Sequence, residues 1–206
     1  MPNVFDLVKC TIIGDCNVGK TSIINKFFNI ATEEDNKDTN NCTIGAVYWS
    51  LSKIINNKKI KINLWDTAGQ EKYNSLIPMY TRSCDILLLT FDLTDKKTFY
   101  NLTRWYNLCK SNLDIKYIII GNKIDRTDFI QVSDQMINEF VSLNFKTDIP
   151  VILTSAKTGE NINEVFDIIF SLGESIINRR KIFYKPINNY ISLNEDSQSE
   201  KKYCCY

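Results

Sequence analysis

The chain has 206 residues, a formal net charge of +1 and no histidine. The near-neutral charge argues against a nucleic-acid-binding protein, and the lack of histidine excludes Ser-His-Asp and Cys-His catalysis and every metal site that uses histidine. None of the seven cysteines forms a C-x-x-C pair, so we expect reduced thiols in the cytosol. No apolar run reaches the ~18 residues of a membrane-spanning helix.

The first half of the chain begins with an apolar strand at residues 8–14, followed by a glycine-containing turn and a helix at 20–29. Two strands at 46–55 and 58–65 then flank Asn56-Asn57, a pair typical of a hairpin turn. An antiparallel hairpin is therefore expected within the sheet.

The second half alternates apolar strands with helical patterns. Its strands are nearly uninterrupted apolar runs, which is typical of strands covered on both faces. This alternation predicts an α/β fold with a six-stranded, mostly parallel sheet and helices on both faces. The predicted strands are 85–92, 117–121 and 149–154, and the predicted helices are 96–113, 133–144 and 161–180.

The turn after the first strand matches the phosphate-binding pattern G-x-x-x-x-G-K-[ST], placed between a strand and a helix as the motif requires. Its backbone N–H groups and the helix N-terminus suit phosphates, Lys20 suits the outer phosphates, and Thr21 suits Mg²⁺. The alternative to a phosphate-binding loop is an ordinary glycine-containing turn between a strand and a helix. For Cys16, the role of a passive small residue is favoured over that of a redox sensor. The predicted nucleotide contacts here are Gly14, Asp15, Cys16, Asn17, Val18, Gly19, Lys20, Thr21 and Ser22.

Two later segments each follow an apolar strand and predict which base is bound. In Asn122-Lys123-Ile124-Asp125, the carboxylate of Asp125 can accept two hydrogen bonds from guanine, a donor pair that adenine lacks. In Ser155-Ala156-Lys157, the Ala156 N–H can reach the guanine O6. The predicted base contacts are Asn122, Lys123, Asp125, Ser155, Ala156 and Lys157.

Four residues between these motifs predict a hydrolytic centre. Thr43 can complete the Mg²⁺ sphere with Thr21, Asp66 can hold the Mg²⁺ shell through water, and Gly69 offers an N–H to the γ-phosphate. Gln70 can orient the attacking water, so the predicted catalytic residues are Gln70, Thr43 and Lys20. Such phosphoryl transfer is intrinsically slow, on the order of 10⁻⁴ to 10⁻³ s⁻¹.

The phosphate loop, the segment Trp65-Asp66-Thr67-Ala68-Gly69-Gln70-Glu71 and the two base-reading segments, in this order, resemble the Rab family of small GTPases in the Ras superfamily. The resemblance covers residues 5 to about 180 and the terminal cysteines, and segments 43–46 and 73–80 resemble the early-endosomal branch. It implies a P-loop NTPase G domain at 1–182, a GDP/GTP switch in vesicular traffic, and a monomer that works with an exchange factor, a GTPase-activating protein and effectors. A hydrolysis-impaired GTP-binding scaffold is the alternative, and Asp125 argues against an ATPase or kinase.

The resemblance also implies an effector surface and a lipid anchor. The effector surface comprises Ile44, Tyr48, Trp65 and Tyr80, although core packing is the alternative for Trp65. The polar tail at 183–206 ends in Cys204-Cys205-Tyr206, which resembles the paired cysteines that Rabs prenylate. It implies a prenylation escort, a GDP-dissociation inhibitor, and cycling between cytosol and an endosomal or vesicular membrane.

The segment between residues 29 and 42 departs from the family pattern. It is polar and a few residues longer than the family norm, and it lacks the aromatic that usually packs on the guanine. Faster nucleotide exchange is the expectation from this departure.

Overall fold

The computed structural model describes residues 7–32, 43, 45–69, 75–109, 114–146 and 148–183. Four predicted site residues lie outside these ranges: Ile44, Gln70, Cys204 and Cys205.

Six strands form a single sheet, as predicted, in the order β2-β3-β1-β4-β5-β6. All neighbouring pairs are parallel except β2 and β3, which form the expected antiparallel hairpin around Asn56-Asn57. The strands are β1 (Leu7–Ile13), β2 (Ala46–Ile55), β3 (Lys58–Thr67), β4 (Ile86–Asp92), β5 (Lys116–Asn122) and β6 (Val151–Thr154).

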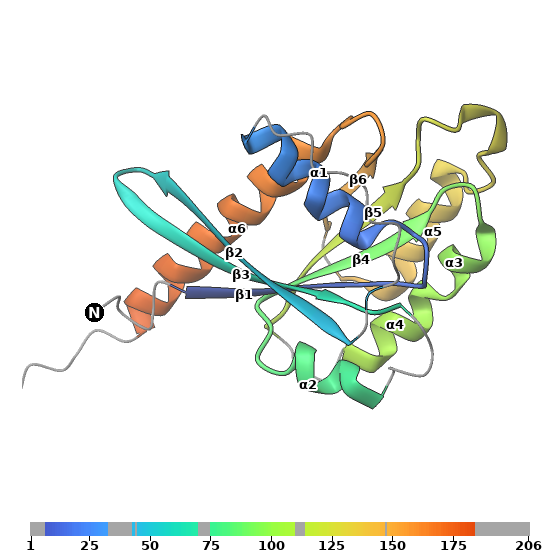
Figure 1. Ribbon diagram of the computed structural model, residues 1–206. Coiled ribbons are helices and arrows are strands. Elements are labelled where there is room, and N and C mark those ends of the chain that lie inside the picture. The colour runs from blue at the N-terminus through green and yellow to red at the C-terminus, as the bar shows by residue number, and fades with distance from the viewer. Residues whose placement is uncertain are drawn as a thin grey trace, which may run out of the picture.

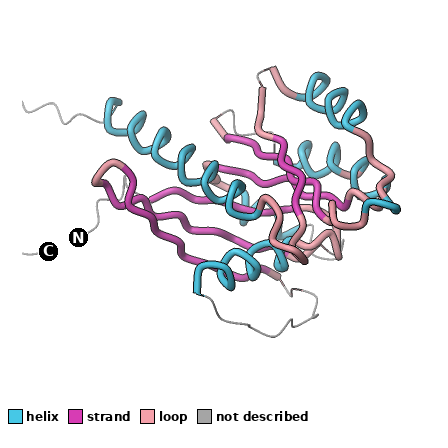
Figure 2. Tube along the Cα trace, turned by 90° about the horizontal axis from the view of Figure 1, so that it is seen from above, coloured by secondary structure: helices cyan, strands magenta, loops and turns pink. Residues whose placement is uncertain are grey.

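Helices cover both faces of this sheet (Figures 1 and 2). One face packs against α1 and α6 and the other against α2, α3, α4 and α5, which confirms the predicted layering. The helices are α1 (Lys20–Thr32), α2 (Ile77–Thr81), α3 (Lys96–Tyr100), α4 (Leu102–Cys109), α5 (Asp134–Asn144) and α6 (Ile162–Phe183). Within the described residues no helix is both long and apolar enough to cross a bilayer.

Two helical segments differ from the prediction. Helix α2 was not predicted, since five residues that include Pro78 are too short to show an amphipathic period. The single helix predicted at 96–113 is divided at Asn101 into α3 and α4. The division is slight, because the Asn101 carbonyl still accepts from the Trp105 N–H at 3.1 Å.

The apolar core lies on both faces of the central strands. Every residue of β4 is buried, which explains why its sequence is a nearly uninterrupted apolar run rather than an alternating one. Ile86 and Leu88 face the α1–α6 side, whereas Leu87 and Leu89 face the other. Burying a side chain of this size contributes about 1.5–3 kcal/mol, so the core fixes the strand ends from which the polar loops project.

Candidate nucleotide-binding site

The phosphate loop joins β1 to α1 and needs glycine at both of its ends. Gly14 has a φ of 150°, and a Cβ there would lie 2.1 Å from the carbonyl oxygen of Thr90. Gly19 has a φ of 98°, and its Cβ would lie 2.2 Å from Nδ2 of Asn122. Since side chains are excluded by both backbone strain and contact, the two glycines bring the loop backbone close to its neighbours.

Lys20 is the charged group of this loop. Its side chain is only 6% exposed, and Nζ donates to the carbonyl oxygens of Gly14 at 2.9 Å and Asp15 at 2.8 Å. A buried ammonium beside the loop carbonyls and a helix N-terminus suits a polyphosphate.

The three predicted Mg²⁺ ligands converge next to the loop. Oγ1 of Thr21 donates to Oδ2 of Asp66 at 2.6 Å and lies 2.9 Å from Oγ1 of Thr43. Asp66 is fully buried, and its Oδ1 has no hydrogen-bond partner among the described residues. Burial raises the pKa of the Asp66 carboxyl, whereas the Thr21 hydroxyl and the charge of Lys20 act to lower it. An orphaned buried carboxylate oxygen beside two hydroxyls fits the oxygen-only shell of Mg²⁺.

Gly69 packs directly on the phosphate loop. A Cβ at this position would lie 2.3 Å from the carbonyl carbon of Asp15. The backbone at the end of the Asp66–Gly69 segment is therefore held against the place where phosphates would bind, as the predicted γ-phosphate contact requires.

The side chain of Asp15 turns away from the loop. Its Oδ2 accepts from Nδ2 of Asn101 at 2.6 Å and its Oδ1 from the indole N–H of Trp105 at 2.7 Å. Both carboxylate oxygens are thus engaged by α4 and the residue before it. The predicted contact of Asp15 with the nucleotide is left to its backbone, and the sequence analysis missed Asn101 and Trp105 as supports of the loop.

Asn122 connects the phosphate loop with the two base-reading segments. Its Nδ2 donates to the carbonyl oxygen of Val18 at 2.8 Å. Its Oδ1 accepts from Oγ1 of Thr154 at 3.2 Å and from the Ala156 N–H at 3.1 Å. In this structure the Ala156 N–H, predicted to reach the guanine O6, donates to Asn122. Asn122 is 2% exposed, and we therefore assign it a positioning role.

Asp125, the predicted guanine reader, is held by Ser155. Oγ of Ser155 donates to Oδ1 of Asp125 at 2.7 Å and accepts from the Thr158 N–H at 3.0 Å. The two base-reading segments therefore meet, although Asp125 and Ser155 are thirty residues apart in the chain. Lys157 follows them as an exposed residue.

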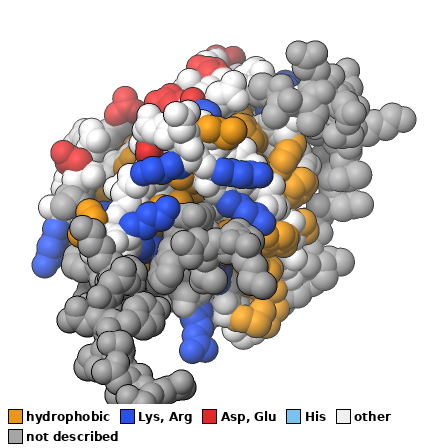
Figure 3. Space-filling view, turned by 90° about the vertical axis from the view of Figure 1, so that its left-hand side faces the viewer, with side chains coloured by type: hydrophobic (Ala, Val, Ile, Leu, Met, Phe, Trp, Pro, Cys, Tyr) orange, Lys and Arg blue, Asp and Glu red, His pale blue; other side chains and the backbone are white. Residues whose placement is uncertain are grey.

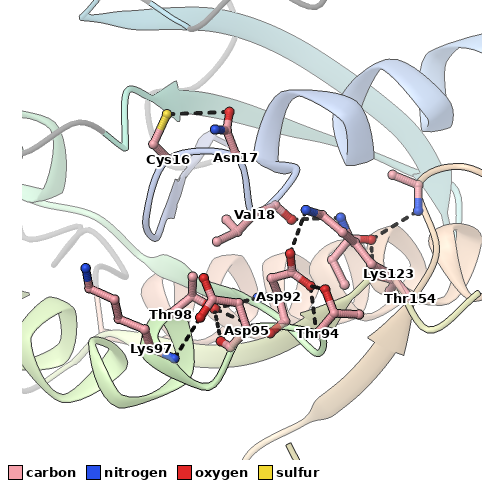
Figure 4. Close-up of polar contacts among 12 residues, drawn as sticks. Cys16, Asn17, Val18, Asp92, Thr94, Asp95, Lys97, Thr98, Lys123 and Thr154 are labelled. Atoms are coloured by element: carbon pink, nitrogen blue, oxygen red, sulfur yellow. Dashed lines mark hydrogen bonds and ion pairs between the residues drawn. The ribbon is translucent and has the colours of Figure 1, made fainter. Parts of the chain in front are cut away.

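Lys123 forms an ion pair that the sequence analysis missed. Its Nζ lies 2.6 Å from Oδ2 of Asp92 at the end of β4, and the Asp92 side chain also accepts from Thr94 (Figure 4). Burial alone would raise the pKa of Asp92, but the hydrogen bonds from Lys123 and Thr94 leave it below its ordinary value. The sequence did contain a signal for this ion pair. Asp92 ends one predicted strand and Asn122-Lys123 follows the next, and the carboxyl ends of parallel strands meet at the same end of a sheet.

Cys16 and Asn17 form the tip of the phosphate loop and lie away from the Lys123–Asp92 ion pair (Figure 4). Asn17 has a φ of 63°, a conformation that asparagine tolerates. The Cys16 thiol donates to Oδ1 of Asn17 at 3.6 Å.

Three of the predicted effector residues meet on the outer face of the β2–β3 hairpin. The ring centroids of Tyr48 and Trp65 are 5.3 Å apart, and those of Trp65 and Tyr80 are 5.7 Å apart. Tyr48 is 46% exposed and Trp65 is only partly buried. The three rings therefore form a surface cluster, and Trp65 is not an ordinary core residue.

Comparison with known proteins agrees with this geometry. Residues 9–174 match the model of the Ras family. The chain is 32% identical to Ras-related protein SEC4 of Saccharomyces cerevisiae, over 97% of this chain and 91% of that protein. It is 31% identical to the Ypt/Rab-type GTPase ypt7 of Schizosaccharomyces pombe, over 96% and 97% of the two chains.

A third relative, Ras-related protein Rab7 of Drosophila melanogaster, is 34% identical over 79% of this chain and 78% of its own. Relatives with several different Rab and Ypt names match at similar identity, so the comparisons do not single out one branch. What they have in common is the family. The chain belongs to the Rab small GTPases of the Ras family, switches of vesicular traffic that bind GTP and GDP and hydrolyse GTP.

Proposed function

We propose that this Rab protein is a slow, Mg²⁺-dependent GTPase that recruits effectors to an endosomal membrane when GTP is bound. The observation that carries the proposal is the convergence of Thr21, Thr43 and Asp66 beside the phosphate loop. It joins the metal site to the segment that senses the γ-phosphate.

Guanine is selected by Asp125 in this proposal. Its carboxylate accepts from N1–H and the exocyclic amine of the base, while Ser155 fixes its orientation at 2.7 Å. The aliphatic stem of Lys123 covers the base plane, and the pair with Asp92 holds that stem in place at 2.6 Å. Adenine would leave the Asp125 carboxylate without donors, which is costly at a buried site.

Hydrolysis is phosphoryl transfer to water by positioning and electrostatics. Lys20 and the N–H of Gly69 stabilise charge on the outer phosphates, and Gln70 orients the water. Bound Mg²⁺ would neutralise charge between the β- and γ-phosphates. Thr21 and Thr43 would hold that ion with their hydroxyls, and Asp66 would act through its solvent shell.

The switch arises because two segments that sense the nucleotide, one around Thr43 and one around Gly69, are attached to the effector surface. Thr43 and Gly45 lead into β2, which carries Tyr48, and the Ala68 N–H donates to the Gly45 carbonyl at 2.8 Å. Loss of the γ-phosphate removes the contact of Gly69 and weakens the metal site that Thr43 helps to form, which releases these segments. Effector binding to the Tyr48–Trp65–Tyr80 cluster and Ile44 would then follow the nucleotide state.

Membrane attachment is proposed to use prenyl groups on Cys204 and Cys205, since two lipid chains give stable anchoring. We place the domain boundary at 182/183, close to the end of α6 at Phe183. The further partners are an exchange factor, a GTPase-activating protein, a prenylation escort and a GDP-dissociation inhibitor. The endosomal assignment is supported by segments 43–46 and 73–80.

Single-turnover hydrolysis of bound GTP tests the proposal. Wild-type protein should release phosphate slowly and only with Mg²⁺, and Gln70→Leu should slow release while leaving GTP binding unchanged. Unchanged turnover in Gln70→Leu would remove this residue from the mechanism. Absence of phosphate release from the wild type, even with an activating protein, would support the hydrolysis-impaired scaffold instead.

A further inference from the structure

The end of the sheet at which the parallel strands begin, opposite the nucleotide site, is strongly basic. Strands β1, β3, β4 and β5 begin there, and the hairpin turn and the end of α6 lie beside them (Figure 1). Lys and Arg side chains gather in the middle of this face, and Asp and Glu lie along its upper rim (Figure 3). We call this surface the basic end; it comprises Lys9, Lys58, Lys59, Lys61, Arg82, Lys116, Arg179, Arg180 and Lys181.

Hydrogen bonds and strand register show that the basic end is one continuous surface. Nζ of Lys9 donates to the carbonyl oxygen of Arg82 at 2.7 Å, which joins β1 to the loop after α2. Nη1 of Arg180 donates to the carbonyl oxygen of Leu7 at 2.8 Å, which joins α6 to β1. Leu7 is in turn the register partner of Lys61 on β3.

Carboxylates at this end are too few to neutralise it. Asp85 forms an ion pair with Arg180, and Asp114 lies 3.7 Å from Arg179. Lys59 and Lys61 are exposed on β3 and form no ion pair with any carboxylate of the described residues. The described carboxylates here are Asp85, Asp114, Asp148 and Glu174, fewer than the nine basic side chains, so a positive potential extends into solvent.

Apolar side chains are exposed among these charges. Ile54 is 74% exposed and is the cross-strand partner of Lys59, so both point to the same side of the hairpin. Ile182, in the last turn of α6 next to Lys181, is 71% exposed. Basic side chains mixed with exposed aliphatic ones suit the boundary between lipid headgroups and acyl chains.

The chain that follows α6 adds no net charge to this end. Between residue 184 and the terminus, basic residues are balanced by as many acidic ones: Lys185, Lys201 and Lys202 against Glu195, Asp196 and Glu200. The last described element, α6, ends at Phe183 within the basic end, and the sequence after it includes the two terminal cysteines. Any electrostatic attraction of the whole protein to a negative membrane must therefore come mainly from the folded domain.

We propose that the basic end docks on the surface of an anionic lipid bilayer. Three observations favour a bilayer over an acidic protein. The charge extends over both sheet faces at this end, exposed isoleucines lie within it, and α6, the last described element before the terminal cysteines in the sequence, ends there. In this orientation the nucleotide site, at the other end of the strands, faces away from the membrane and stays open to regulators.

Sedimentation of the full, unlipidated, GDP-loaded chain with vesicles tests this docking. One set contains phosphatidylcholine alone and the other about 30% phosphatidylserine, at about 0.1 M salt where surface charges still act. Wild-type protein should bind the anionic vesicles at least ten-fold more tightly. Lys59→Gln/Lys61→Gln should lose roughly ten- to thirty-fold of that binding, since each surface charge contributes about five-fold.

Lys96→Gln/Lys97→Gln is the matched control. It removes the same charge from two exposed residues of α3, outside the basic end, and should retain anionic-vesicle binding. Equal losses in the two variants would show an effect of net charge alone and overturn the proposal. So would equal binding of wild type to both vesicles, or binding to soluble polyglutamate without vesicle binding, the result expected of an acidic-protein site.

Docking of the basic end and the proposed GTPase switch both place the protein at a membrane, but docking depends on surface charge and the switch on nucleotide binding. GDP affinity measured on the same preparations separates the two, because intact GDP binding without vesicle binding overturns the docking alone. Loss of GDP binding in wild type would instead count against the nucleotide switch.

Discussion

The two ends of the sheet use charged side chains in opposite ways. At the carboxyl ends of the strands, Lys20 and Asp66 are buried and Asp125 is held by a hydroxyl, all in contacts of 2.6–2.9 Å. At the amino ends, Lys59 and Lys61 are exposed and unpaired among described residues. Buried, mutually positioned charges give chemical specificity, whereas exposed charges give long-range attraction with little effect on folding. Substitutions at the two ends should therefore differ in both size and kind.

Asp125→Asn is expected to have the largest effect at the nucleotide end. The amide cannot accept both guanine hydrogen bonds, so GTP affinity should fall by about a hundred-fold or more, while affinity for xanthosine triphosphate should rise. Competition binding of the two nucleotides measures the change. Asp128→Asn, an exposed carboxylate three residues further on, is the control and should leave the preference intact. Retained guanine preference in Asp125→Asn would show that another group reads the base.

Asp92→Asn should have the next largest effect. Removing the partner of Lys123 costs about 1.5–3 kcal/mol for a hydrogen bond to a charged group, so GDP should dissociate roughly ten-fold faster. The pKa of Asp92 is held below its ordinary value. Its contribution to stability is therefore present above about pH 4 and is lost as the pH falls through the lowered pKa.

Urea unfolding of wild type and Asp92→Asn at pH 6 and near pH 3 measures that linkage. The difference in unfolding free energy between them should shrink at the lower pH. A difference that stays the same at both values would mean that the carboxylate charge of Asp92 is not what stabilises the native state.

Asn101→Ala should have a smaller effect, through the phosphate loop. It removes one of the two donors to the Asp15 carboxylate, the other being the Trp105 indole. With the indole donor still in place, the loss of this bond corresponds to about 1 kcal/mol and roughly a five-fold loss of GDP affinity. Asn107→Ala, an exposed residue on α4, serves as control. Equal GDP affinity in both variants would show that Asp15 does not depend on Asn101.

This difference between the ends also explains how much the sequence could predict. Phosphate and guanine chemistry restrict Gly14, Lys20, Thr21 and Asp125 to few residue types at fixed positions along the chain. Those residues could therefore be found without coordinates, as could the strands, whose buried apolar runs are distinctive. Asn101 and Trp105 were missed because their role depends on how α4 packs against the loop.

The basic end was missed for a related reason. Its lysines and arginines come from β1, β3, β5, α6 and the loop after α2, and no single local pattern joins these separate segments. The near-neutral net charge of +1 conceals the separation of charge between the ends. Only the parallel register of β1 with β3 shows that Lys61 and Lys9 belong to one surface.

Lys59→Gln/Lys61→Gln should have the smallest effect on folding and nucleotide binding. Both side chains are exposed on β3, so the unfolding free energy should change by less than about 0.5 kcal/mol, and GDP affinity should stay within about two-fold because screening weakens charges at this distance. Denaturant unfolding and GDP titration measure these two quantities. A larger loss of GDP affinity would mean that the ends are coupled through β3, whose carboxyl end carries Asp66. The positive potential of the basic end would then help to hold the nucleotide.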